Sequence, residues 1–252
     1  MIVGMTTPAE RLQAVRDRIA AAARAAGRDP ASVALLAVSK TWSADDVRAL
    51  AALGQAAFGE NRAQELTAKA AELAHLPLEW HFVGQLQRNK AAAVARTGAV
   101  VHSLDRSALA RALSWAGEER GAPVGVFVQV DLGGAAGELA ERGGVAPDDV
   151  ARLADEVAGL PGLELRGLMA VAPRGEPPAP AFARLAVLGE RLRADHPGAT
   201  GLSAGMSGDL EEAVAAGATL VRVGTALFGS RPLTSPGVTP VTGVPPGSSE
   251  EV

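Results

Sequence analysis

One lysine of the sequence stands at the end of an apolar run, where a buried strand would reach solvent. The run Val33–Val38 is followed by Ser39, Lys40 and Thr41. A lysine amine that is partly removed from water loses its proton more easily, and the neutral amine forms a Schiff base with an aldehyde. The alternative is a lysine whose methylene stem lies along the strand end while its charge stays in water. Lys40 is therefore a candidate for covalent chemistry with a carbonyl compound.

Two later turns are built from small residues and lead into helical patterns. The first spans Ser203–Asp209 and the second spans Arg222–Thr225. Small residues at a helix N-terminus bind phosphate through free N–H groups and the positive end of the helix dipole. The alternative is that Ser207 and Thr225 only cap their helices. The two turns together favour a phosphate group.

The side chain of Arg222 narrows the choice of ligand. A Schiff-base lysine beside a phosphate site is typical of pyridoxal 5′-phosphate proteins and of phosphosugar aldolases. A pyridoxal ring nitrogen needs a partner, and an arginine in that place keeps the ring neutral, which makes it a weaker electron sink than a carboxylate partner would. The alternative for Arg222 is an interior salt bridge.

Residues so far apart in the chain must be brought together by a repeated fold. A short apolar run, a few polar or glycine residues and a longer stretch with helical periodicity recur along the sequence. Eight such runs begin at Val33, Ala56, Trp80, Ala99, Val124, Leu163, Gly201 and Thr219. Alternating strands and helices predict a parallel sheet, and eight units in about 230 residues match the size of a (β/α)8 TIM barrel. A doubly wound open α/β sheet is the alternative.

Polar side chains follow several of the predicted strands. Chemistry in a barrel is expected at the carboxyl ends of the strands. Glu60 and Asn61 follow the second strand, and His81 lies within the third. Glu60 and Gln64 are most simply interpreted as helix-capping residues.

Three segments lie outside the repeat. Thr7–Glu10 has the form of a capping box with proline at the first helical position, which predicts an extra helix that ends near Gly27. Pro173–Pro180 contains four prolines and predicts a loop between the sixth strand and its helix. Residues 231–252 are rich in proline and glycine and predict a disordered tail. We therefore expect one domain over residues 1–230, followed by the tail.

The composition argues against several classes of protein. Hydrophobic residues make up 48% of the chain and aromatic residues 3%, so the core is expected to consist of Ala, Val and Leu. The net charge of −4 argues against a nucleic-acid partner, and the absence of cysteine together with four scattered histidines argues against a metal. Without a signal-peptide pattern or a membrane-spanning run, we expect a cytoplasmic protein with no membrane partner. The net charge and the lack of an obvious exposed apolar face predict a monomer.

Several longer motifs occur in a fixed order along the chain. They read LAVSKT, FGENRAQE, WHFVGQLQRNK, GLMA, GMSGD and VRVGTALFG, at residues 36–41, 58–65, 80–90, 167–170, 205–209 and 221–229. With these motifs, the chain resembles the pyridoxal phosphate homeostasis proteins, the YggS/PROSC family, over roughly residues 8 to 230. Several motifs in order are far more specific than any one of them.

The resemblance implies a fold and a cofactor. The fold is a barrel like the N-terminal domain of alanine racemase, of fold-type III, and the cofactor is pyridoxal 5′-phosphate on Lys40. By the same resemblance, Arg222 faces the pyridine nitrogen and Asn61 lies beside the ring. His81 is a candidate for the wall of the pocket.

The resemblance also assigns residues to the phosphate of the cofactor. Ser207, Gly224 and Thr225 are implied to surround it, with Met206 and the backbone beside them. Ser203 is a further phosphate candidate.

The sequence departs from the family after the fifth strand. Many relatives have Lys-x-Gly there, whereas this chain has Glu141, Arg142 and Gly143. Arginine stays protonated and forms no stable imine. A second, lysine-based contact with the cofactor is therefore not expected.

The absence of tyrosine bears on the choice between binding and catalysis. A racemase of this fold type needs an acid/base on each face of the cofactor, and the second is normally a tyrosine, which this chain lacks entirely. We therefore expect a non-enzymatic protein that binds and buffers pyridoxal phosphate and delivers it, with apoenzymes as the recipients. The alternatives are a low-activity pyridoxal-phosphate-dependent racemase or decarboxylase, and a Schiff-base aldolase on the same barrel.

Overall fold

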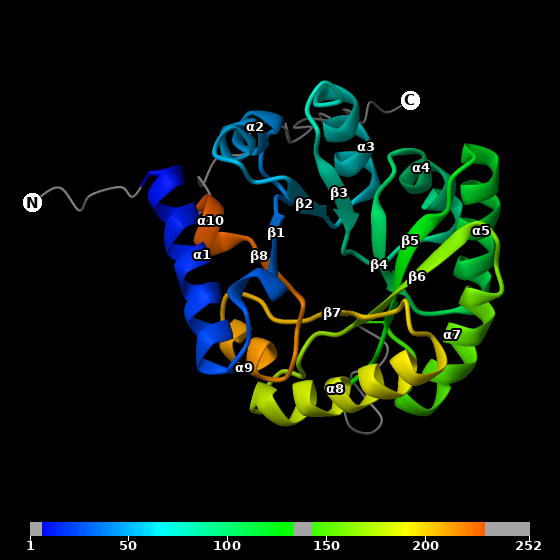
Figure 1. The fold of residues 1–252 in the computed structure, drawn as a ribbon. Coiled ribbons are helices and arrows are strands. Elements are labelled where there is room, and N and C mark those ends of the chain that lie inside the picture. Colours follow the sequence, from blue (N-terminus) through cyan, green and yellow to red (C-terminus); the bar gives the residue numbers. More distant parts are fainter. Residues whose placement is uncertain (1–6, 134–142, 230–252) are drawn as a thin grey trace, which may run out of the picture.

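All eight predicted strands are present, and they close into a parallel barrel (Figure 1). The computed structural model describes residues 7–133 and 143–229. The strands are β1 (Ala34–Val38), β2 (Ala57–Glu60), β3 (Glu79–Phe82), β4 (Val100–Leu104), β5 (Val124–Gln129), β6 (Leu163–Met169), β7 (Gly201–Ser203) and β8 (Leu220–Val223). Each strand pairs with the next in the chain, and β8 pairs with β1, so no strand edge is left open. The TIM barrel is confirmed, and the open doubly wound sheet is excluded.

Helices surround the barrel between the strands (Figure 1). They are α1 (Pro8–Ala25), α2 (Ala44–Ala52), α3 (Ala63–Glu72), α4 (Ala91–Arg96), α5 (Ser107–Arg120), α7 (Val150–Ala158), α8 (Pro178–Asp195), α9 (Leu210–Ala215) and α10 (Thr225–Phe228). Short 3-10 turns occupy Pro30–Ser32, Arg88–Lys90 and Pro147–Asp149.

The extra N-terminal helix α1 starts as the sequence predicts. The Thr7 hydroxyl accepts a hydrogen bond from the Glu10 N–H (3.2 Å), and the Glu10 carboxylate accepts one from the Thr7 N–H (2.7 Å). These two bonds satisfy donors that a helix start otherwise leaves free. The helix packs against α9 and α10, next to the end of the barrel repeat (Figure 1).

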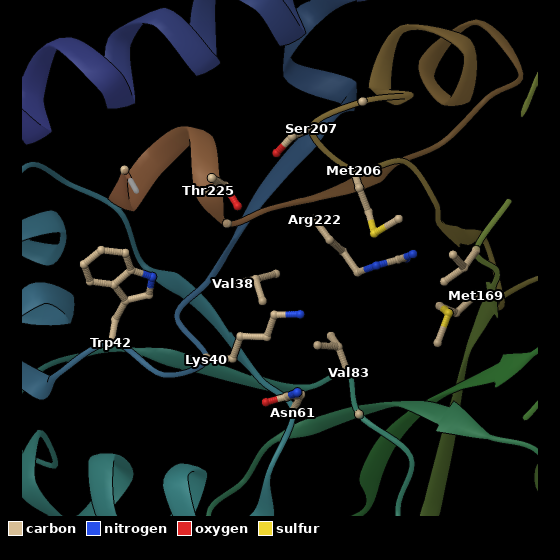
Figure 2. A pocket seen from close by; sticks show the side chains of 15 residues that line it. Val38, Lys40, Trp42, Asn61, Val83, Met169, Met206, Ser207, Arg222 and Thr225 are labelled. Atoms are coloured by element: carbon tan, nitrogen blue, oxygen red, sulfur yellow. The ribbon is translucent and has the colours of Figure 1, made fainter. Parts of the chain in front are cut away.

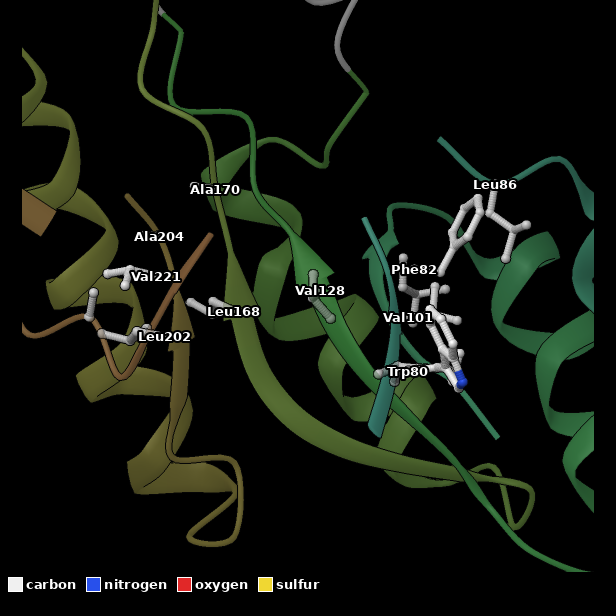
Figure 3. Close-up of a cluster of buried hydrophobic side chains, with 14 of the residues drawn as sticks. Trp80, Phe82, Leu86, Val101, Val128, Leu168, Ala170, Leu202, Ala204 and Val221 are labelled. Carbon is white, nitrogen blue, oxygen red and sulfur yellow. The ribbon is translucent and has the colours of Figure 1, made fainter. Parts of the chain in front are cut away.

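The apolar core lies mainly between the outer face of the barrel and the helices. Figure 3 shows part of it, with Trp80 and Phe82 of β3 beside Val101 of β4. Small aliphatic side chains make up most of the buried apolar set, as the composition predicts. Such side chains allow the helices to lie close to the strands. The inside of the barrel is different, because several of its side chains are polar.

Gly167 in β6 shows how closely two strands of the barrel approach one another. Its φ is +146°, and a Cβ atom there would lie 1.9 Å from the carbonyl oxygen of Gly201 in β7. We expect Gly167→Ala to lower the free energy of unfolding by about 3 kcal/mol or more, since neither the backbone angle nor the space admits a side chain. Denaturant titration measures this. Gly198→Ala, where a Cβ meets nothing within 4 Å, is the control and should change stability by less than about 1 kcal/mol.

The predicted loop Pro173–Pro180 is shorter than expected. Helix α8 already begins at Pro178, with proline in its first turn. Proline fits the first turn because the N–H it lacks has no partner inside a helix at that place. The predicted tail and Arg142 fall outside the described residues. No helix in the described ranges is long and apolar enough to cross a membrane.

Candidate functional site

A cavity of about 620 Å³ opens at the carboxyl ends of the barrel strands (Figure 2). Seven of the nine residues predicted for the cofactor line it: Lys40, Asn61, Met206, Ser207, Arg222, Gly224 and Thr225. The remaining two, His81 and Ser203, do not line the cavity. Apolar side chains that the sequence did not single out complete the wall, among them Val38, Trp42, Val83, Met169 and Val171.

Lys40 follows β1 at the cavity, and its amine is free. Among the described residues, its Nζ atom has no hydrogen-bond or ion-pair partner, while the preceding Ser39 is completely buried. In Figure 2 the side chain extends into the cavity near Val38, Val83 and Asn61. An unpaired amine in this position is available to react with an aldehyde.

The backbone around Lys40 is held on both sides. The Ser39 carbonyl accepts a hydrogen bond from Nζ of Lys69 (2.9 Å), and the Thr41 N–H donates to the Glu65 carboxylate (2.8 Å). Thr41 has a φ of +69°, a left-handed angle that non-glycine residues seldom adopt. Such an angle persists where surrounding contacts enforce it. The lysine is therefore presented on a fixed segment.

Glu60 is a buried member of this support, and its interpretation as a helix-capping residue is wrong. It ends β2 with no exposed surface, and its Oε1 atom accepts hydrogen bonds from Nζ of Lys69 (2.6 Å) and from the Ser39 hydroxyl (2.7 Å). Burial raises the pKa of Glu60, although both donors favour the carboxylate. The cap of α3 has no side-chain hydrogen bond, so Gln64 does not cap it either.

Arg222 is buried in β8 and reaches the cavity wall. Its Nη1 donates to the carbonyl oxygen (2.6 Å) and the hydroxyl (2.7 Å) of Ser203, and its Nη2 donates to the Ala170 carbonyl (2.8 Å). Burial lowers the pKa of Arg222 to about 10, so the guanidinium remains charged at neutral pH. In the described part of the chain it makes no ion pair, so it is not the interior salt bridge considered above.

The two small-residue turns meet at one side of the cavity. Figure 2 shows Ser207 and Thr225 near each other there. Neither hydroxyl caps a helix: Asp209 precedes α9, where its carboxylate accepts from the Met206 N–H (2.6 Å), and Gly224 precedes α10. Because α9 and α10 contain only six and four residues, the hydroxyls and small residues matter more than a helix dipole.

Two further observations concern the space and the polarity of this wall. A Cβ atom on Gly224 would lie 3.1 Å from the Val38 carbonyl oxygen, so a side chain there would crowd the cavity edge. The Oδ1 atom of Asn61 is buried and has no hydrogen-bond partner in the part of the chain that the structure describes. A buried acceptor of this kind is commonly satisfied by a ligand or water.

His81 and Ser203 lie inside the barrel, behind Arg222. Both are buried, and each takes part in hydrogen bonds of the barrel interior. Sequence position alone did not reveal this, since a strand residue points either inward or outward. Trp42 could have been found, because it follows Lys40 by two residues; its ring stacks on Phe228 with 5.5 Å between centroids.

Comparison with known proteins identifies the family. Residues 11–232 match the family described as alanine racemase, N-terminal domain. A pyridoxal phosphate homeostasis protein of Pseudomonas aeruginosa is 48% identical over 235 residues, which cover 92% of this chain and 99% of that protein. The chain belongs to the pyridoxal phosphate homeostasis protein family. The resemblance seen in the motifs is thereby confirmed.

Solved structures of this family and of related barrels agree with the fold. PipY of Synechococcus elongatus PCC7942, solved with PLP bound, is 38% identical with a TM-score of 0.77, over 88% of this chain and all of that one. Alanine racemase from Streptomyces coelicolor A3(2) is 23% identical with a TM-score of 0.65, over 88% of this chain and 59% of that one. The racemase shares the barrel, and its likeness extends to the fold alone.

Proposed function

We propose that this member of the pyridoxal phosphate homeostasis family binds pyridoxal 5′-phosphate as a Schiff base on Lys40 and serves as an intracellular reserve of the cofactor. The observation that carries the proposal is the cavity itself. It combines a buried guanidinium with a lysine amine and two hydroxyls that have no hydrogen-bond partner among the described residues. A related chain that shares the fold holds PLP in its solved structure.

The residues present fit the functional groups of the cofactor. Ser207, Gly224 and Thr225 would surround the phosphate with hydroxyls and with space, and Met206 would lie beside them. Arg222 has five N–H groups, of which three donate to protein acceptors in the described residues, so donors remain for a ring nitrogen. Asn61 would offer, beside the ring, a buried oxygen that has no partner within residues 7–133 and 143–229.

When bound, the cofactor supplies an aldehyde that condenses with an amine and a conjugated ring that absorbs visible light. Lys40 would hold it covalently, and Arg222 would keep the ring nitrogen unprotonated because a guanidinium donates and does not accept hydrogen bonds. The ring then remains a weak electron sink. This favours storage over turnover.

We infer that the protein is not an efficient enzyme. Two-base racemisation requires a second acid/base, and the chain contains no tyrosine to provide it. The recipients would be apoenzymes that require the cofactor, and we take the shared compartment to be the cytoplasm. A low-activity racemase or decarboxylase, or an aldolase, is the alternative.

Reconstitution tests the proposal. The purified protein, incubated with pyridoxal phosphate and separated from the excess by gel filtration, is expected to be yellow, to contain about one cofactor per chain and to activate an apoenzyme when the two are mixed. Amino-acid racemisation is expected to be far slower than about 1 per second, the lower end of ordinary enzyme turnover. A colourless protein, or turnover at enzyme-like rates, contradicts the proposal.

A further inference from the structure

The inside of the barrel contains a row of polar side chains behind Arg222. Barrel interiors are usually filled by branched aliphatic residues. Here Ser203 of β7, His102 of β4 and His81 of β3 lie in that space, with Glu79 at the start of β3. We call Ser203, His102, His81 and Glu79 the interior chain.

Consecutive members of the interior chain are within hydrogen-bond distance or close to it. The Ser203 hydroxyl is 2.9 Å from Nδ1 of His102, and Nε2 of His102 is 2.8 Å from Nδ1 of His81. The buried Nε2 of His81 makes no hydrogen bond of normal geometry to any described residue, and Oε1 of Glu79 lies 3.4 Å from it. Contact with His81 lowers the pKa of Glu79, so Glu79 is a carboxylate at neutral pH.

Arg222 determines the direction of these hydrogen bonds. A guanidinium only donates, so the Ser203 oxygen accepts from Nη1 of Arg222. The hydroxyl hydrogen of Ser203 then needs an acceptor, because an unsatisfied buried donor is costly. Among the described residues, the acceptor within reach is Nδ1 of His102.

The same reasoning assigns the tautomers of both histidines. Burial and the nearby Arg222 guanidinium hold the pKa of His102 well below its usual range, so the ring is neutral and carries one N–H. With Nδ1 accepting, that hydrogen is on Nε2 and is donated to Nδ1 of His81. Because Nδ1 of His81 accepts this hydrogen, the N–H of His81 is on Nε2, which faces the Glu79 carboxylate.

We propose that the interior chain positions the Arg222 guanidinium through hydrogen bonds that all run in one direction, from Ser203 to Glu79 at the opposite end of the barrel. Its members are positioning residues and touch no ligand. The Phe127 ring stacks on the His102 ring with 4.5 Å between their centroids, which limits the movement of the imidazole. The consequence for cofactor retention rests on the proposed function, in which Arg222 faces the ring nitrogen.

The tautomers are measured on the protein without cofactor. Long-range ¹H–¹⁵N NMR of the imidazole rings is expected to show both His81 and His102 with hydrogen on Nε2 at neutral pH. The surface His196, which pairs with Asp155 at 2.9 Å, serves as a reference ring. Hydrogen on Nδ1 of either interior histidine overturns the proposal.

How firmly the Arg222 guanidinium is held is measured by the rate at which its N–H hydrogens exchange with water, in the same cofactor-free protein. We expect slow exchange in the wild type and at least tenfold faster exchange in Ser203→Ala, which removes one acceptor of the guanidinium. Equal exchange in the two proteins overturns the proposal. Neither measurement requires the cofactor, so a failure of cofactor binding is distinguishable from a failure of the interior chain.

Glu79→Leu tests the end of the interior chain that lies farthest from Arg222. The Glu79 side chain is 64% exposed, so it can be replaced without leaving a cavity in the core. We expect the loss of the Glu79 carboxylate to shift the ¹⁵N signals of His102, although the two side chains are not in contact. Release of pyridoxal phosphate is expected to become about two- to tenfold faster, which corresponds to the free energy of one hydrogen bond. Glu72→Leu is the matched control, since this exposed carboxylate pairs with Arg48 (3.4 Å) outside the interior chain. Identical His102 signals and release rates in the two variants overturn the proposal.

Discussion

Lys40→Ala is expected to abolish covalent binding of pyridoxal phosphate and the yellow absorption that accompanies it. The amine of Lys40 is the one that reaches the cavity, and no other lysine lines it among the described residues. Visible spectra, followed by borohydride reduction and mass spectrometry of peptides, measure the adduct. The expected loss is complete, because a Schiff base cannot form without the amine.

The small number of lysines makes the controls for this experiment unusually clean. The chain has three, Lys40, Lys69 and Lys90. Lys69 is buried against Glu60, whereas Lys90 lies in the turn Arg88–Lys90 outside the cavity. Lys90→Ala should keep the adduct at the wild-type level. A reduced adduct on Lys69 or Lys90 in the Lys40→Ala protein, at wild-type yield, would remove Lys40 from its role.

Lys40→Arg separates the covalent bond from the charge. Arginine keeps a positive charge at the same place but forms no stable imine. We therefore expect this variant to be colourless and to retain some pyridoxal phosphate through Arg222 and the turn hydroxyls. Equilibrium dialysis measures the retained fraction.

The sequence predicted the barrel and most of the cavity for a physical reason. Each strand is a short apolar run followed by polar or glycine residues, and the carboxyl ends of parallel strands meet at one end of a barrel. Lys40, Asn61, Ser207 and Thr225 follow their strands and were therefore placed correctly at the cavity. That these four residues lie close together could be predicted from the strand pattern alone, without knowing how side chains pack.

The supports behind the cavity were not predicted, because they depend on packing between elements. His81 and His102 meet because β3 and β4 are paired with His81 opposite Val100, a register that neither strand specifies alone. Glu60 looked like a capping residue because it stands before a helix, and only the buried amine of Lys69 from that helix shows its role. The strand pattern also left the inward or outward direction of Ser203 open.

The buried pair of Glu60 and Lys69 should show strong energetic coupling. Glu60→Leu leaves the buried Lys69 amine without its carboxylate partner. Lys69→Met leaves the buried Glu60 with only the Ser39 hydroxyl as a donor among the described residues. Each single change is therefore expected to lower the free energy of unfolding by about 3–5 kcal/mol. The double variant restores an apolar contact and should lie within about 2 kcal/mol of the wild type. Denaturant titration of all four proteins gives the coupling energy. Additive losses in the double variant would mean that the pair does not interact.

A surface ion pair provides the comparison. Nη2 of Arg48 and Oε1 of Glu72 are 3.4 Å apart, and the two side chains are 41% and 58% exposed. The same cycle there is expected to give a coupling energy below about 1 kcal/mol, because water already solvates both charges.

The pH dependence of stability shows whether the protonated or the ionised form of Glu60 favours folding, which the coupling energy does not show. Burial raises the pKa of Glu60 above its value in the unfolded chain, near 4.5, so the folded protein binds the proton more tightly. The contribution of Glu60 to the free energy of unfolding is therefore fully present below pH 4.5, and it declines as the pH rises through the raised pKa. The wild type should lose stability relative to the double variant over that interval. If the wild type instead gained stability relative to the double variant as the pH rises, the hydrogen bonds from Lys69 and Ser39 would outweigh the cost of burying the carboxylate. Glu60 would then hold the Lys40 segment chiefly as an anion.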